Sequence, residues 1–282
     1  MSNLLQLTGV SKEFEQFKLQ DIDFSLPAGT IMGLIGENGA GKTTIIKLIL
    51  GLQQKDGGQI SVLGYAPENL PLTEKARIGL VLDDFPFPET FNSREVEMIM
   101  RNIYPNWDEK VFLDLCTRFA LPSKKALKTY SKGMKMKLQL AVALSHQAKL
   151  LILDEATSGL DPVAREEILD LLLEFIQDES CSVLMSSHII SDLEKVCDYI
   201  TYIHQGKIIF SEEKDFLREE YGVLRGAKNM TAELPADAVI GIRQHQFGEE
   251  ALVWRAKMPH GAALEPASLE DIMIYYNKRK EG

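Results

Sequence analysis

Short apolar runs alternate with helical patterns over the first two hundred residues of the chain. Three runs are continuously apolar, as is typical of strands covered on both faces: Ile31-Met32-Gly33-Leu34-Ile35, Leu150-Leu151-Ile152-Leu153 and Val183-Leu184-Met185. Between the last two runs, apolar residues recur at helical spacing, at Ile168, Leu171, Leu172, Phe175 and Ile176. This alternation predicts an α/β fold built on a mainly parallel sheet.

A different pattern occupies residues 84 to 148. A Phe/Pro-rich loop leads there into helical segments at Arg94 to Ile103 and Lys110 to Phe119. We interpret this stretch as a helical insertion between strands of the sheet.

The last third of the chain predicts a small α+β appendage. A hairpin over Tyr199 to Phe210, turning at Gln205-Gly206, precedes the expected elements: a helix over Glu212 to Tyr221 and strands over Ala238 to His245 and Ala251 to Ala256. Ser268-Leu269-Glu270-Asp271 is a capping-box pattern that opens a last helix. We therefore expect one domain over residues 1–210 and an accessory domain over residues 211–282.

Length and charge narrow the class of protein. The chain has 282 residues, enough for about two domains, and its 31 basic against 41 acidic residues give a net charge of -10. That charge argues against nucleic-acid binding over the whole surface. No apolar run approaches the ~20 residues needed to cross a bilayer. Cys116, Cys181 and Cys197 form no C-x-x-C pair, which favours a reduced, cytoplasmic protein with core cysteines over a free reactive thiol.

A glycine-rich loop carries the first chemical motif. Gly36-Glu37-Asn38-Gly39-Ala40-Gly41-Lys42-Thr43 fits G-x-x-x-x-G-K-[ST], follows an apolar strand and opens a helix over Thr44 to Leu50. Backbone N–H groups and the positive helix end then face one point, which suits a polyphosphate. We expect Lys42 to reach the β and γ phosphates and the Thr43 hydroxyl to hold Mg²⁺. The nucleotide-binding candidates are Gly36, Asn38, Gly39, Ala40, Gly41, Lys42, Thr43 and Thr44.

Two carboxylates end the second apolar strand. Asp154 and Glu155 follow Leu150-Leu151-Ile152-Leu153 directly, and a buried charge needs a partner. Mg²⁺ supplies one, so we expect Asp154 to bind the metal through water and Glu155 to act as the general base on an attacking water.

Further motifs in order along the chain resemble the ATP-binding-cassette (ABC) ATPases. Tyr130-Ser131-Lys132-Gly133-Met134 is similar to their signature motif, and Ser158-Gly159-Leu160-Asp161 to their D-loop. His188 matches the family's switch histidine, and Phe14 occupies the place of the aromatic residue that stacks on adenine. The resemblance covers about residues 3 to 210. It implies a nucleotide-binding subunit that pairs head to tail with a second cassette, identical or related, around two ATP molecules.

Two departures from the family pattern concern charge. Asp83 and Asp84 follow the strand where the family usually has a glutamine, so Asp83 could bind Mg²⁺ or its water, or both could be solvated loop residues. In the signature motif, Lys132 replaces a glycine and Met134 a glutamine. Ser131 and Gly133 remain as the positions that would face the partner's phosphate.

Residues 123 to 149 concentrate positive charge. This stretch has no Asp or Glu and seven lysines, at 124, 125, 128, 132, 135, 137 and 149. Two interpretations have equal weight. The lysines form a solvated helix face, or they attract nucleotide or balance charge at a dimer interface. Contact with RNA or DNA comes third, because no aromatic platform accompanies the lysines.

The resemblance implies an ATPase that powers a separate membrane permease, of the exporter branch for antibiotics and membrane-active peptides, at the cytoplasmic face of the membrane. The loop Phe85 to Phe91 is a candidate for gripping the permease, with local packing as the alternative. A soluble ABC-type ATPase acting on ribosomes or DNA is the alternative function. A sensor that binds ATP without turnover is a third hypothesis, which Glu155 argues against.

Overall fold

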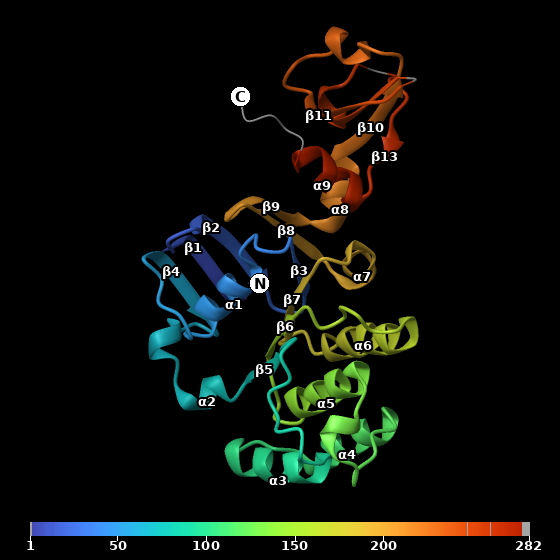
Figure 1. The fold of residues 1–282 in the computed structure, drawn as a ribbon. Helices are drawn as coiled ribbons and strands as arrows, with labels where there is room; N and C mark the ends of the chain where they lie inside the picture. Colours follow the sequence, from blue (N-terminus) through green and yellow to red (C-terminus); the bar gives the residue numbers. More distant parts are fainter. Residues whose placement is uncertain (1, 247, 260, 278–282) are drawn as a thin grey trace. The chain divides into compact units, whose positions relative to one another are not determined.

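The computed structural model describes residues 2–246, 248–259 and 261–277. The chain divides into two compact units, residues 1–211 and 212–282, which are described separately. The first unit contains two sheets with helices around them, and the second contains one small sheet (Figure 1).

A six-stranded sheet forms the centre of the first unit. Its strand order is β5 (Ile78–Val81), β6 (Leu150–Asp154), β7 (Ser182–Ser187), β3 (Ile31–Ile35), β8 (Tyr199–His204) and β9 (Lys207–Glu213). From β5 to β8 every neighbouring pair is parallel, so these strands place their carboxyl ends along one edge. All residues of β3, β6 and β7 are buried, which confirms the strands expected from the continuous apolar runs.

An antiparallel sheet covers the first helix. Its order is β2 (Lys18–Pro27), β1 (Asn3–Glu13) and β4 (Gly57–Val62). Helix α1 (Lys42–Ile49) packs its buried Ile45, Ile46 and Leu48 into a core shared by both sheets. This packing fixes the N-terminus of α1, and with it the phosphate loop, at the carboxyl end of β3.

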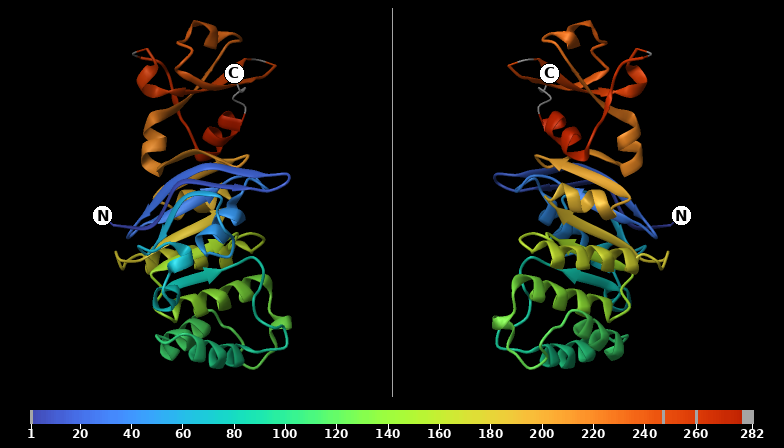
Figure 2. Two further views of the ribbon diagram at one scale, coloured as in Figure 1. Left: turned by 90° about the vertical axis from the view of Figure 1, so that its left-hand side faces the viewer. Right: turned by 90° about the vertical axis from the view of Figure 1, so that its right-hand side faces the viewer.

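The insertion expected between strands is helical. It contains α3 (Ser93–Ile103), α4 (Glu109–Arg118) and α5 (Lys132–Leu144), which lie together at one end of the first unit (Figures 1 and 2). Asn92 and Glu95 form a capping box at the start of α3, and Ser131 caps α5 by accepting a hydrogen bond from the Met134 N–H at 3.2 Å. Helix α2 (Leu72–Lys75) precedes β5, and α6 (Pro162–Phe175) and α7 (Ile190–Val196) follow β6 and β7.

The second unit differs from the expected pattern at two strands, neither of which the sequence analysis expected. Its helices are α8 (Lys214–Glu220) and α9 (Leu269–Asn277), and its sheet order is β11 (Val239–Gln244), β12 (Glu249–Trp254), β10 (Tyr221–Gly226) and β13 (Glu265–Pro266). The helix expected over Glu212 to Tyr221 ends at Glu220, and the sequence analysis missed β10. Tyr221 and Val223 are buried there, and β10 pairs with β12 over its whole length. Sheet pairing therefore overrides the helical pattern. The capping box at Ser268 and Asp271 is confirmed by reciprocal 3.0 Å hydrogen bonds.

The three cysteines are free and buried. Burial raises the pKa of the Cys116 thiol to about 12, which keeps it protonated at neutral pH. The interpretation as core residues is therefore confirmed. No helix among residues 2–246, 248–259 and 261–277 combines the length and the apolar character that a membrane span requires.

Candidate functional site

The phosphate loop holds the side chain of Lys42 in place. Gly39 and Gly41 have φ values of 83° and 119°, a region that favours glycine, and a Cβ at Gly36 would lie 2.4 Å from the Ile203 carbonyl oxygen. Lys42 Nζ donates to the carbonyl oxygens of Gly36 at 2.7 Å and Glu37 at 3.3 Å. The loop thus presents a buried cation at the start of α1, where the helix dipole adds positive potential.

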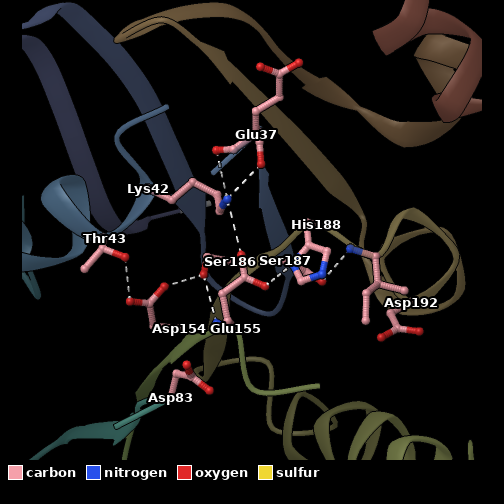
Figure 3. A network of polar contacts seen from close by, with 12 residues as sticks. Glu37, Lys42, Thr43, Asp83, Asp154, Glu155, Ser186, Ser187, His188 and Asp192 are labelled. Carbon is pink, nitrogen blue, oxygen red and sulfur yellow. Dashed lines mark hydrogen bonds and ion pairs between the residues drawn. The ribbon is translucent and has the colours of Figure 1, made fainter. Parts of the chain in front are cut away.

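The two carboxylates at the end of β6 face this loop. Asp154 Oδ2 accepts from the Thr43 hydroxyl at 2.9 Å, and Asp154 Oδ1 accepts from the Ser186 hydroxyl at 2.6 Å. Asp154 and Ser186 are register partners on the parallel strands β6 and β7, which places both side chains on the same face. Figure 3 shows Thr43, Asp154 and Ser186 as one connected group.

Glu155 lies between a lysine and a histidine. Its Oε1 is 3.2 Å from Lys42 Nζ, and its Oε2 is 2.6 Å from His188 Nδ1 (Figure 3). The Glu155 backbone has φ 53° and its N–H donates to Ser186 Oγ at 3.0 Å, which stabilises the sharp turn after the strand. The structure thus brings Lys42, Thr43, Asp154, Glu155 and His188 together from three segments of the chain.

A cavity of about 400 Å³ adjoins the phosphate loop. Its lining combines loop residues with aromatic and amide side chains: Gln16, Phe17, Lys18, Gln20, Glu37, Asn38, Gly39, Ala40 and Gln205. Phe17 is in this lining. Phe14 is 39% exposed and its ring centroid is 6.3 Å from that of Phe17, so the aromatic residue expected to stack on adenine lies next to a ring that lines the cavity.

The oxygen donors of the site suit a hard divalent cation. Asp154 is 8% exposed, and within the described part of the chain it forms no ion pair, only hydrogen bonds from two hydroxyls. A buried carboxylate without a cation is costly, and Mg²⁺ prefers carboxylate and hydroxyl oxygens. The residues present therefore fit Mg²⁺ at Thr43 and Asp154.

Comparison with known proteins decides the family. The family model described as ABC transporter matches residues 19–158. The lantibiotic transport ATP-binding protein SrtF of Streptococcus pyogenes is 32% identical over 75% of this chain and 92% of its own. The bacitracin transport ATP-binding protein BcrA of Bacillus licheniformis is 32% identical over 87% of this chain and 80% of its own. A solved ATP-binding subunit of an ABC transporter superposes with a TM-score of 0.69 at 29% identity, covering 76% of this chain and 92% of that one.

The chain belongs to the ABC transporter ATP-binding proteins. It is an ATPase subunit that hydrolyses ATP to power a separate membrane permease. The α/β cassette fold expected from the sequence is confirmed. The function as a soluble ATPase on ribosomes or nucleic acid is not favoured.

In this ABC ATPase, Asp83 contacts the signature motif. Its Oδ1 is 2.7 Å from Lys132 Nζ, so the two charged departures from the family pattern form one ion pair within the chain. Gln139 of α5, which the sequence analysis missed, fixes the preceding residue: its side chain accepts from the Leu82 N–H and donates to the Leu82 carbonyl, both at 3.0 Å. Asp83 is thereby held at the end of β5, where the strand meets α5.

The other signature and D-loop residues lie at helix starts. Gly133 and Met134 are in the first turn of α5, after the N-cap Ser131. Asp161 caps α6 by accepting from the Val163 N–H at 3.1 Å and the Ala164 N–H at 3.0 Å. The hydrogen bond from Ala164 lowers the pKa of the exposed Asp161 carboxyl, which therefore stays ionised at neutral pH.

The lysine-rich stretch has acidic partners from other segments. Lys135 pairs with Glu89 at 2.7 Å, and Lys137 pairs with Glu167 of α6. These contacts offset part of the positive charge within the chain, and the Lys135 and Lys137 side chains are 22% and 13% exposed. In the loop Phe85 to Phe91, the rings of Phe85 and Phe87 pack edge to face at 5.5 Å, which favours local packing there.

Proposed function

We propose that Lys42, Thr43, Asp154, Glu155 and His188 carry out MgATP hydrolysis in this cassette. The observation that carries the proposal is the position of the Glu155 carboxylate, which contacts Lys42 on one side and His188 on the other. A base beside the residue that binds the phosphates is within reach of a water at the γ phosphorus.

Each residue has one task in the proposed mechanism. The β and γ phosphates are bound by Lys42 and by the N–H groups of the phosphate loop, whose other candidate residues are Gly36, Asn38, Gly39, Ala40, Gly41 and Thr44. Thr43 and Asp154 hold Mg²⁺, which neutralises phosphate charge when bound. Phe14, with Phe17 beside it, contacts the adenine.

Glu155 accepts the proton of the attacking water. As the water oxygen bonds to the γ phosphorus, the bond from that phosphorus to the bridging oxygen breaks and ADP leaves with the electron pair. The proton is then held at a Glu155 oxygen. His188, through its contact with Glu155 Oε2, keeps the carboxylate directed at the water.

A second cassette completes the proposed site. At the start of α5, the signature residues of one subunit face the γ phosphate bound by the other: Ser131, Lys132, Gly133 and Met134. The helix start carries positive potential, which attracts an anion. Asp161 belongs to the same interface. The partner cassette is a second copy or a related ATPase.

We further propose the roles of the two domains, the class of transported compound and the cellular location of this ATPase. Residues 1–210 act as the ATP-binding domain, with residues 84–148 as its helical subdomain, and residues 211–282 form an accessory domain. The names of SrtF and BcrA refer to lantibiotic and bacitracin transport, so we propose an exporter of antibiotics or membrane-active peptides. The cassette then works at the cytoplasmic face of the membrane, bound to permease subunits.

Light scattering tests the two-cassette site. We expect Glu155→Gln to dimerise with MgATP at micromolar protein and to be monomeric without nucleotide, because slow hydrolysis preserves the bridging γ phosphate. Ser131→Ala in the same background weakens the dimer by removing the cap of α5. A monomer under both conditions would contradict the proposal.

A further inference from the structure

An arginine contacts both the segment that follows β6 and the helix that follows β7. Arg165 lies in α6, four residues after Asp161. Asp192 lies in α7, four residues after His188 (Figure 3). Arg165 Nε is 3.7 Å from Asp192 Oδ2, and Arg165 Nη2 donates to the Leu160 carbonyl oxygen at 3.4 Å. One guanidinium therefore contacts both the D-loop, which follows Glu155, and the helix that follows His188.

Burial makes this pair hard to rearrange. The Asp192 side chain is 2% exposed and that of Arg165 26%. Within residues 2–246, 248–259 and 261–277, neither Arg165 Nε nor Asp192 Oδ2 has a hydrogen-bond partner, so the ion pair is the polar contact of these two atoms. Removing the guanidinium leaves the buried Asp192 carboxylate without this cation, which forces the helices to move or admits water.

The position of His188 depends on α7. His188 lies between the end of β7 and the start of α7, where the Ile189 N–H donates to Ser187 Oγ at 3.0 Å. A shift of α7 relative to α6 changes the 2.6 Å separation of His188 Nδ1 and Glu155 Oε2. Misplacement of a reacting group by about 1 Å can lower a rate about 10²-fold.

We propose that Arg165 and Asp192 are positioning residues, which hold α6 and α7 at the spacing that keeps His188 in contact with Glu155. The inference rests on the proposed function, because it takes Glu155 as the base of ATP hydrolysis. Neither residue is assigned a contact with nucleotide.

Steady-state ATPase kinetics test the role of the charge. We expect Arg165→Met and Asp192→Asn to lower kcat by about 10- to 100-fold while KM for MgATP changes less than about twofold. Arg165→Lys keeps a cation near Asp192, so it retains more of kcat than Arg165→Met. An unchanged kcat in both Arg165→Met and Asp192→Asn overturns the proposal.

A double variant separates positioning from general destabilisation. If Arg165 acts through His188, Arg165→Met in the His188→Ala background lowers kcat less than about twofold further. A merely structural role lowers kcat by the same factor in both backgrounds, and that result overturns the proposal. Should Arg165→Met fail to fold, Arg165→Lys and Asp192→Asn are measured in the same two backgrounds.

The same two helices offer a matched control. Lys195 of α7 pairs with Glu166 of α6, and these side chains are 51% and 52% exposed. Exposed pairs contribute little, so Lys195→Met leaves kcat within about twofold of the parent. A loss equal to that of Arg165→Met overturns the proposal. Unchanged turnover in Glu155→Gln instead overturns the proposed function, so the two failures are distinguishable.

Discussion

At the residue scale, we propose that Lys42 is the cation on which nucleotide binding depends most. Its ammonium group is buried, held by two loop carbonyls and 3.2 Å from Glu155. We expect Lys42→Ala to weaken MgATP binding by at least about 10-fold, because a charged hydrogen bond contributes about 1.5–3 kcal/mol. Calorimetry measures the affinity, with Lys47→Ala, an exposed lysine of the same helix, as the control. Normal affinity in Lys42→Ala would refute the assigned role.

Asp83 gives a second prediction at this scale. If its carboxylate attracts Mg²⁺ and repels the triphosphate, Asp83→Gln shifts the Mg²⁺ concentration for half-maximal ATPase about 3- to 10-fold upward. The affinity of Asp83→Gln for nucleotide without Mg²⁺ stays similar to that of the parent or becomes slightly stronger.

The ion pair with Lys132 supplies the control for Asp83. Lys132→Met breaks the same 2.7 Å contact but keeps the carboxylate. If Lys132→Met shifts the Mg²⁺ concentration for half-maximal ATPase as much as Asp83→Gln does, the shift comes from loss of the ion pair and not from loss of a metal contact. If Asp83→Gln and Asp84→Asn both titrate with Mg²⁺ like the parent, these carboxylates are ordinary loop residues.

At the element scale, the end of α5 joins the helical insertion to the sheet. His146 Nδ1 is 2.8 Å from the Ala76 carbonyl oxygen, so this nitrogen donates, and its ring stacks on Tyr104 at 3.9 Å. Burial lowers the pKa of His146 below its ordinary 6.5. Below pH 6.5 the unfolded chain therefore binds a proton at His146 more readily than the folded chain does. The free energy of unfolding consequently decreases as the pH is lowered.

Replacing His146 removes this titration. We expect His146→Asn, which can still donate to Ala76, to lose less unfolding free energy than the parent between pH 7 and pH 5. Urea unfolding at the two pH values measures the difference. An identical loss in both proteins would mean that His146 does not contribute to acid destabilisation.

The sequence predicts elements better than it predicts contacts between them. The apolar runs of β3, β6 and β7 and the glycine-rich loop are local signals, so their positions follow from residue order. The Asp154–Ser186 and Arg165–Asp192 contacts depend on strand and helix adjacency, which periodicity does not encode. Gln139 has only the weak signal of a polar side chain on a buried helix face, where it is 3% exposed. Residues 221–226 form the strand β10 because they pair with β12, a contact that the local helical pattern does not reveal.

At the scale of the whole molecule, every proposed site residue from Phe14 to His188 lies in the unit of residues 1–211. The phosphate loop, the Asp154–Glu155 pair and His188 follow the strands β3, β6 and β7. These strands are parallel and adjacent, so their carboxyl ends bring phosphate loop, metal ligands and base to one edge. Ligands bind at this edge in open α/β sheets. We therefore propose that the ATP hydrolysis that powers the transporter takes place in this one unit.

The turnover of Glu155→Gln at saturating MgATP tests that account most directly. An amide keeps the size of the side chain but cannot accept the proton of the attacking water. We expect phosphate release to fall by about 10²- to 10⁴-fold, with MgATP affinity within about threefold of the parent. Turnover equal to that of the parent, with normal binding, would place the base elsewhere and contradict the account.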